Sequence, residues 1–284
     1  MSEEEMQAAL PPQGGSVPYE AITSSTLEAS KATTAFGRTV IRVNDVFSPQ
    51  TLKDTNCFLD RPSGCSFSYS NQGNNLRGIS IYKIIEDLDT SVFLDSNGKI
   101  RNHQNINGNI CEEAKVLSPL VFESFEKMAS ILRWNDMKVP LEPQIICYSL
   151  DHSQDAIKDL PWHYDECTLT MSVIISPEIQ GPTLYHGGKL SFARRAYENE
   201  PLIKGLKLVE LNDFKFYPET EQVFPYTING GFIFDNLHTV HKVSDILYSG
   251  PSGGKVERRL FTVFASPEVE YVRHLPDLVT ENLV

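Results

Sequence analysis

The chain has 284 residues and a mass of 31.9 kDa, and 40% of its residues are hydrophobic while 22% are charged. This composition is ordinary for a globular protein and excludes collagen, a long coiled coil and a wholly disordered chain. A chain of this length can bury a sizeable core, so it needs no disulfide or metal to stabilise it, and it suits a single all-β or α/β domain.

The charge balance is acidic, with a formal net charge of −12 and a pI near 5.1. Such a surface repels phosphate backbones and anionic lipid headgroups, so we expect no nucleic-acid partner and no membrane association. The N-terminus is acidic where a signal peptide would be basic. Five cysteines at irregular spacing, without a C-x-x-C pair, predict neither a disulfide framework nor a zinc knuckle. We therefore expect a cytoplasmic protein; its oligomeric state is left unknown.

Residues 1–34 are rich in Ser, Thr, Ala, Gly, Pro and Glu and have no sustained hydrophobic period. They predict a flexible N-terminal tail with a short helix around residues 21–31. Residues 35–284 are expected to form one domain, beginning with a β-branched strand at residues 38–44 that leads into a strand–helix layer.

The first predicted helix follows this strand. Ser48 can cap a helix and Pro49 suits the first helical turn, while Phe47 and Leu52 have the spacing of a hydrophobic staple. These signals predict a helix that ends near Leu59.

A second strand is predicted at residues 78–85, and the Asn- and Gly-rich residues 95–109 are expected to form a loop. Ser118 and Pro119 repeat the cap signature and are predicted to open the clearest helix of the chain. Its apolar residues recur every three to four positions and predict one buried stripe, made of Leu117, Val121, Phe125, Met128 and Leu132.

The second half of the chain has a different sequence pattern. Short β-rich runs are separated by Gly- and Pro-containing turns, and they lie at residues 144–150, 169–175, 189–193, 223–228, 231–235 and 259–265. Many short strands separated by such turns predict a barrel or a double-sheet jelly roll. The fold class is therefore mainly β with flanking helices (α+β), and the helices are expected to cover one face.

The candidate metal ligands begin with the segment Pro-Trp-His-Tyr-Asp, which holds His163 and Asp165. Residues two apart on a strand point to the same side, so an imidazole and a carboxylate can meet one metal ion. His241 lies 78 residues after His163 and is the candidate third ligand. Two His and one Asp leave coordination positions open, which is typical of non-heme Fe(II) oxygenases.

The order of these motifs resembles the Fe(II)/2-oxoglutarate-dependent dioxygenase superfamily. The resemblance covers residues 140–266 and rests on the H-x-D triplet at His163, the Gly-Gly-Lys-Leu run at 187–190, the run at 231–235, His241-Lys-Val and the Arg258-Arg259 pair. It implies a double-stranded β-helix, or cupin-like jelly roll, that binds Fe(II) through His163, Asp165 and His241. It also implies 2-oxoglutarate as cosubstrate and O₂ as oxidant.

In this superfamily an arginine binds the distal carboxylate of 2-oxoglutarate, because a guanidinium meets a carboxylate with two parallel hydrogen bonds. Only one of two adjacent residues on a strand can point inward. Arg258 is favoured and Arg259 stays an alternative. The Ser or Thr that usually follows this arginine by two positions is missing, since Leu260 and Phe261 stand at the two possible places.

Two further residues are weighed for the site. Tyr148, on the strand before the H-x-D triplet, is a candidate to hydrogen-bond 2-oxoglutarate, and a core tyrosine is the alternative. His238 competes with His241 as a ligand, but the Lys-Val after His241 matches the superfamily pattern.

The resemblance implies an enzyme that oxidises, and by default hydroxylates, a C–H bond while 2-oxoglutarate is converted to succinate and CO₂. The acidic surface and compact length favour a small-molecule substrate, such as an amino acid or a secondary-metabolite intermediate. Two alternatives stay open. One is a prolyl-hydroxylase-like enzyme acting on a protein side chain, and the other is a cupin-like metal-binding module that does not use 2-oxoglutarate.

Overall fold

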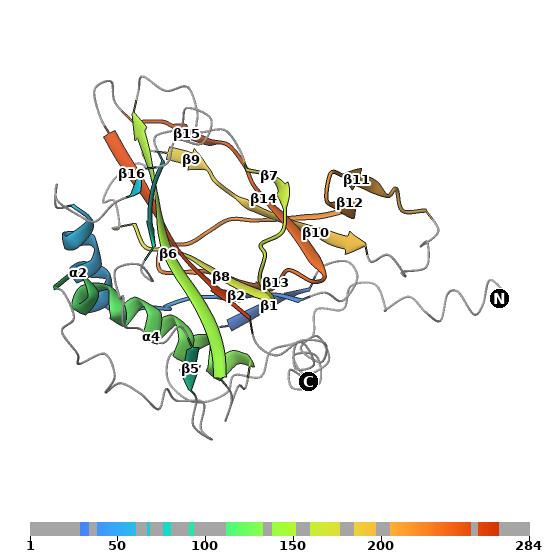
Figure 1. Cartoon of the computed structure of the whole chain (residues 1–284). Coiled ribbons are helices and arrows are strands. Elements are labelled where there is room, and N and C mark those ends of the chain that lie inside the picture. The colour runs from blue at the N-terminus through green and yellow to red at the C-terminus, as the bar shows by residue number, and fades with distance from the viewer. Residues whose placement is uncertain are drawn as a thin grey trace.

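The structure is a computed structural model (Figure 1). It describes residues 29–33, 39–60, 67–68, 76–80, 91–93, 112–132, 138–151, 160–176, 185–196, 205–250 and 255–266. None of its described helices is long and apolar enough to cross a membrane.

Two antiparallel sheets make up most of the described chain. The larger sheet has the order β1 (Ala29–Thr33), β2 (Thr39–Val43), β13 (Gly231–Asp235), β8 (Leu169–Ile174), β16 (Lys255–Ala265), β6 (Lys138–Asp151), β4 (Leu76–Ser80) and β3 (Phe67–Ser68), with β5 (Ser91–Phe93) paired to β6. The smaller sheet has the order β11 (Val209–Leu211), β12 (Phe214–Phe224), β10 (Leu190–Ala196), β14 (Thr239–Val243) and β7 (Leu160–His163). A third pair joins β15 (Ile246–Tyr248) to β9 (Tyr185–Gly187).

The strand order is that of a jelly roll. The chain runs β6, β7, β8, β10, β12, β13, β14 and β16, and most strands that are neighbours in a sheet are not consecutive in this series. The larger sheet contains β13-β8-β16-β6, which are the sixth, third, eighth and first of these strands. The smaller sheet contains β12-β10-β14-β7, the fifth, fourth, seventh and second. The predicted fold class is therefore confirmed, since this is the double-sheet arrangement of cupin-like proteins.

Two helices cover the outer face of the larger sheet, α2 (Pro49–Leu59) and α4 (Glu112–Leu132), as Figure 1 shows. The predicted apolar stripe of α4 lies in this layer, and none of its members exposes more than 3% of its surface. It packs with the outward-facing row of β16, which consists of Phe261, Val263 and Ala265. The apolar core between helices and sheet therefore leaves the opposite sheet face for the barrel interior.

The first helix has the predicted bounds. Ser48 is its N-cap and accepts a hydrogen bond from the backbone of Thr51, while Pro49 stands in the first turn. The start predicted for the second helix is wrong, because α4 begins at Glu112 and carries Pro119 inside it. Residues 112–117 include good helix formers, and burial of Leu117 and Leu120 offsets the hydrogen bond that Pro119 cannot donate.

The N-terminal prediction also needs correction. Residues 29–33 form β1, which pairs along its whole length with β2, so residues 29–31 are a strand and not part of a helix. Pairing with the free edge of β2 satisfies backbone groups that a helix would have satisfied internally. Residues 21–28 and the predicted loop at 95–109 lie outside the described residues, as do residues 81–85 of the second predicted strand.

Candidate metal centre and its surroundings

The three predicted metal ligands lie together. His163 ends β7 and pairs directly with His241 of β14, and their ring centroids are 4.1 Å apart. Asp165 lies two residues beyond β7, so it reaches the site from the turn before β8 and not from a strand. Its Oδ1 is 3.9 Å from Nε2 of His163 and its Oδ2 is 3.7 Å from Nε2 of His241. One ligand atom from each residue lies within 4.8 Å of the other two, which is close enough for one ion.

The two imidazoles are suited to metal binding. Nδ1 of His163 lies 2.7 Å from the carbonyl oxygen of Pro161, which can only accept, so Nδ1 carries the proton and Nε2 presents its lone pair. Burial, and repulsion from His163 whenever that ring is protonated, hold the pKa of His241 well below its usual value. His241 is therefore neutral, and the neutral imidazole is the form that binds metals.

Asp165 sits in a more complex environment. Burial raises the pKa of its carboxyl group, whereas a hydrogen bond from Thr170 and the charge of His163 act in the opposite direction. The Thr170 hydroxyl lies 2.5 Å from Oδ2 of Asp165. A divalent cation beside this carboxyl group would favour its ionised form, as cations do for their ligands.

His238, the competing ligand, is held elsewhere. Its Nδ1 lies 2.9 Å from Oδ1 of Asp235, and its backbone N–H donates to the same oxygen at 2.7 Å. These bonds belong to the turn between β13 and β14, so His238 does not join the cluster of His163, Asp165 and His241.

The two adjacent arginines of β16 face opposite ways. Arg258 is 1% exposed and lies inside the barrel, where its Cζ is 5.3 Å from the ring centroids of Tyr148 and Tyr226. Arg259 faces the helix layer and pairs with Asp60 and Glu257. Since the outer face is covered by helices, alternation along β16 places the first arginine inside and the second outside.

The guanidinium of Arg258 is incompletely paired. Its Nη2 donates to the carbonyl of Gly188 at 3.3 Å, while the buried Nη1 has no hydrogen-bond partner among the described residues. Gly188 has φ +61°, and a Cβ there would lie 3.2 Å from Nε of Arg258. Glycine therefore lets the backbone approach the guanidinium closely.

Four polar residues of this interior were not singled out from the sequence: Thr170, Ser172, Tyr226 and Asn236. Thr170 and Ser172 alternate with buried apolar residues on β8, a period-2 signal that could have identified an inward polar row. The hydroxyl groups of Ser172 and Tyr226 lie 2.9 Å apart. Burial is the main cause that raises the pKa of Tyr226 to about 12, and the charge of Asp165 contributes to the rise while that of Arg258 opposes it. Tyr226 is therefore close enough to both Asp165 and Arg258 to be affected by their charges.

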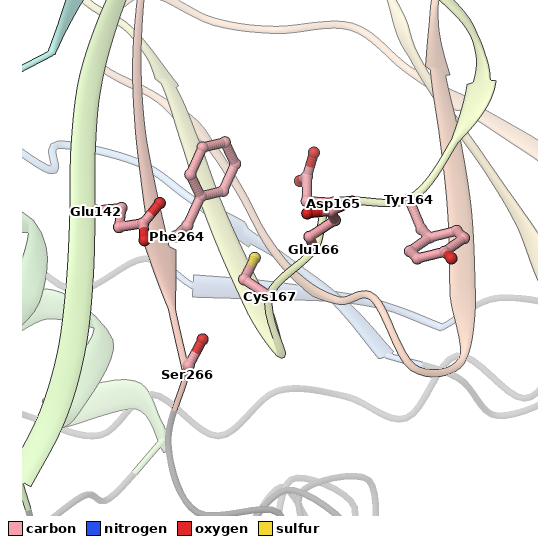
Figure 2. A pocket seen from close by; sticks show the side chains of 7 residues that line it. All are labelled: Glu142, Tyr164, Asp165, Glu166, Cys167, Phe264 and Ser266. Carbon is pink, nitrogen blue, oxygen red and sulfur yellow. The ribbon is translucent and has the colours of Figure 1, made fainter.

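A cavity of about 310 Å³ opens beside Asp165 (Figure 2). Its wall consists of residues 164–167 together with Glu142, Phe264 and Ser266. Glu142 and Phe264 are opposite each other on β6 and β16, and Figure 2 shows both on one side of the cavity with Asp165 across from them. The wall is therefore acidic with one large apolar face, and it includes a candidate metal ligand.

No protein-family model matches the chain, and no curated protein matches it either. Solved structures of similar fold include an oxidoreductase of the 2OG-Fe(II) oxygenase family from Burkholderia pseudomallei, with 10% identity, a TM-score of 0.44, and coverage of 80% of this chain and 85% of that one. A prolyl hydroxylase from Trichoplax adhaerens, solved with a peptide fragment of hypoxia inducible factor, has 11% identity, a TM-score of 0.41 and coverage of 82% and 86%. The epimerase SnoN of nogalamycin biosynthesis has 10% identity, a TM-score of 0.45 and coverage of 84% and 82%. At these identities and TM-scores the likeness does not identify an activity.

Proposed function

We propose that this protein is an Fe(II)- and 2-oxoglutarate-dependent oxygenase. The observation that carries the proposal is one barrel interior that holds both a His-Asp-His cluster and a buried guanidinium with an unpaired N–H group. The cluster supplies the metal ligands, and the guanidinium supplies a site for an anionic cosubstrate.

The donor set fits Fe(II). Two imidazole nitrogens and one carboxylate oxygen are the donor set typical of non-heme Fe(II) oxygenases, and it would leave coordination positions for other ligands. His163, Asp165 and His241 would hold the ion, and the Nδ1 hydrogen bond of His163 fixes the tautomer that presents Nε2.

Arg258 fits the distal carboxylate of 2-oxoglutarate. A buried guanidinium with a free donor is costly unless an anion completes its hydrogen bonds. Tyr148 and Tyr226 flank it, and the raised pKa of Tyr226 keeps its phenolic group a neutral hydroxyl beside the guanidinium. Arg258 also favours this function over a metal-binding module without 2-oxoglutarate, because such a module has no use for the unpaired donor.

The proposed reaction consumes 2-oxoglutarate, O₂ and a substrate C–H group and yields succinate, CO₂ and an alcohol. The iron supplies the activation of O₂ when it is bound. The chain's own residues hold the reactants: Arg258 and Tyr226 orient the cosubstrate, and the barrel walls exclude water from the site.

We infer that the substrate is a small molecule that enters the cavity beside Asp165. The cavity volume lies at the small end of the range for small-molecule sites. Its carboxylates, Glu142 and Glu166, favour a neutral or cationic group over an anionic one. The alternative is oxidation of a side chain on a protein substrate. Release of succinate in the presence of peptide substrates would support that alternative.

The test is an anaerobic titration of the metal-free protein with Fe(II) and then with 2-oxoglutarate, followed by visible absorption. Chelation of the 2-oxo acid by iron gives a weak charge-transfer band, and the band should be absent in Asp165→Ala. If iron binds without a band, 2-oxoglutarate is not the cosubstrate; if Asp165→Ala binds iron as tightly as the wild type, the proposed ligand set is wrong.

A further inference from the structure

We propose that Thr170 and Asn236 are positioning residues that orient Asp165 for the metal. A chain of hydrogen bonds runs from the amide of Asn236 through the hydroxyl of Thr170 to one oxygen of the Asp165 carboxylate. The inference rests on the proposed function, which supplies the metal.

The direction of every bond in this chain follows from donor chemistry. The backbone N–H of Asp165 can only donate, so the group of Asn236 that lies 3.1 Å from it must be the amide oxygen. The amide nitrogen then faces Thr170 and donates to its hydroxyl oxygen at 2.9 Å. The hydroxyl proton of Thr170 is left for Oδ2 of Asp165, 2.5 Å away. Each bond polarises the next, so the chain is stronger than isolated pairs would be.

The chain distinguishes the two oxygens of the carboxylate. Oδ2, which lies 3.7 Å from Nε2 of His241, accepts the proton of Thr170, whereas Oδ1, which lies 3.9 Å from Nε2 of His163, accepts no hydrogen bond from the described residues. Oδ1 therefore keeps both of its lone pairs for a metal, and the hydrogen bond on Oδ2 favours coordination through one oxygen. A carboxylate free to use both oxygens would occupy a position that the 2-oxo acid needs.

Asn236 also joins the two segments that carry the ligands. It lies in the turn between β13 and β14, five residues before His241, and only 1% of its surface is exposed. Its backbone N–H donates to Thr168 at 3.0 Å, and its carbonyl accepts from the guanidinium of Arg195 at 2.8 Å. Asn236 thus fixes the turn after β7, which holds Asp165, relative to the strand of His241.

The main variant is Thr170→Val, which removes the hydroxyl at nearly constant volume. We expect Fe(II) to bind about 10- to 100-fold more weakly, the usual effect of removing a partner of a metal ligand. We also expect 2-oxoglutarate to bind more weakly to the metal-loaded variant, because the second carboxylate oxygen is released. Thr170→Ser keeps the hydroxyl and should retain most of the wild-type affinity for both.

The matched control is Thr220→Val, since Thr220 is also a buried, hydrogen-bonded threonine but belongs to β12 and contacts Tyr217 and Arg194 instead of Asp165. Its Fe(II) affinity should equal that of the wild type. Circular dichroism and thermal melting identify the folded fraction, so affinities refer to folded protein only.

Asn236→Ala provides the second measurement. Because Asn236 and Thr170 act in one chain, the double variant should lose less Fe(II) affinity than the product of the two single losses. Folded Thr170→Val and Asn236→Ala proteins with wild-type Fe(II) affinity would overturn the positioning role, and so would additive losses. Failure of the wild type to bind iron would instead contradict the proposed function, so the two failures are distinguishable.

Discussion

His163 and His241 occupy directly opposed positions on the paired strands β7 and β14, although 78 residues separate them in the chain. Their ring centroids lie 4.1 Å apart, and His241 also contacts the ring of Phe234 at 4.7 Å. Antiparallel pairing holds opposed side chains on the same face of a sheet. The strand register therefore brings the two imidazoles together on one face. The jelly roll thereby presents the two candidate nitrogen ligands from a rigid scaffold, whereas the candidate ligand Asp165 lies on a turn.

Replacement of His241 by alanine should weaken Fe(II) binding by at least about 100-fold, because loss of a ligand exceeds the 10- to 100-fold effect of losing an outer partner. Isothermal titration under anaerobic conditions measures the affinity. His238→Ala is the control, since His238 is bonded to Asp235 and lies outside the ligand cluster. A larger loss in His238→Ala than in His241→Ala would show that the wrong histidine has been assigned.

The two arginines of β16 should give different phenotypes. Arg258→Gln should weaken 2-oxoglutarate binding by about 10- to 100-fold, which corresponds to loss of one charged hydrogen-bonding group worth about 1.5–3 kcal/mol. Arg259→Gln should keep that affinity but lower the free energy of unfolding by about 2 kcal/mol, because it removes the pairing with Asp60 and Glu257.

The charge-transfer band measures the first effect and urea denaturation measures the second. A loss of cosubstrate binding in Arg259→Gln with normal binding in Arg258→Gln would reverse the assignment of the two side chains.

Stability in alkali should depend on Tyr226. Its pKa is raised to about 12 in the folded protein, so the neutral form is favoured by folding. This contribution is complete below the ordinary pKa of about 10 and is lost as the pH rises from about 10 to 12. In Tyr226→Phe the free energy of unfolding should fall less steeply across this window, by about 2–3 kcal/mol in total. Denaturation curves at several pH values measure the difference, and parallel curves for the two proteins would contradict it.

The helix layer should contribute to stability without affecting the metal site. Phe125 is fully buried between α4 and the larger sheet, so Phe125→Ala should lower the free energy of unfolding by about 3–5 kcal/mol. Phe122, on the same helix, is only partly buried, and Phe122→Ala should cost clearly less. Chemical denaturation compares the two variants. Equal destabilisation would contradict the orientation of α4, and Fe(II) affinity should be unchanged in both.

Much of the local structure follows from short-range signals in the sequence. Ser48 and Pro49 predict the start of α2 because capping chemistry involves only neighbouring residues. The predicted start of α4 is wrong for the same reason. Ser118 and Pro119 carry the same local capping signal, but burial of the flanking Leu117 and Leu120 overrides it. Alternating short strands likewise predict the jelly roll, but not that residues 29–33 add a strand to the edge of β2.

The sequence by itself determined the residue types of the site: two His and one Asp in the right order, and an arginine pair on a late strand. Only the tertiary structure decided which arginine faces inward, because alternation separates Arg258 from Arg259 without saying which face the helices cover. It also brought Asn236 to the backbone of Asp165, 71 residues away in the chain. Hydrogen bonds between distant turns depend on how the strands pair, and local sequence patterns do not encode that pairing.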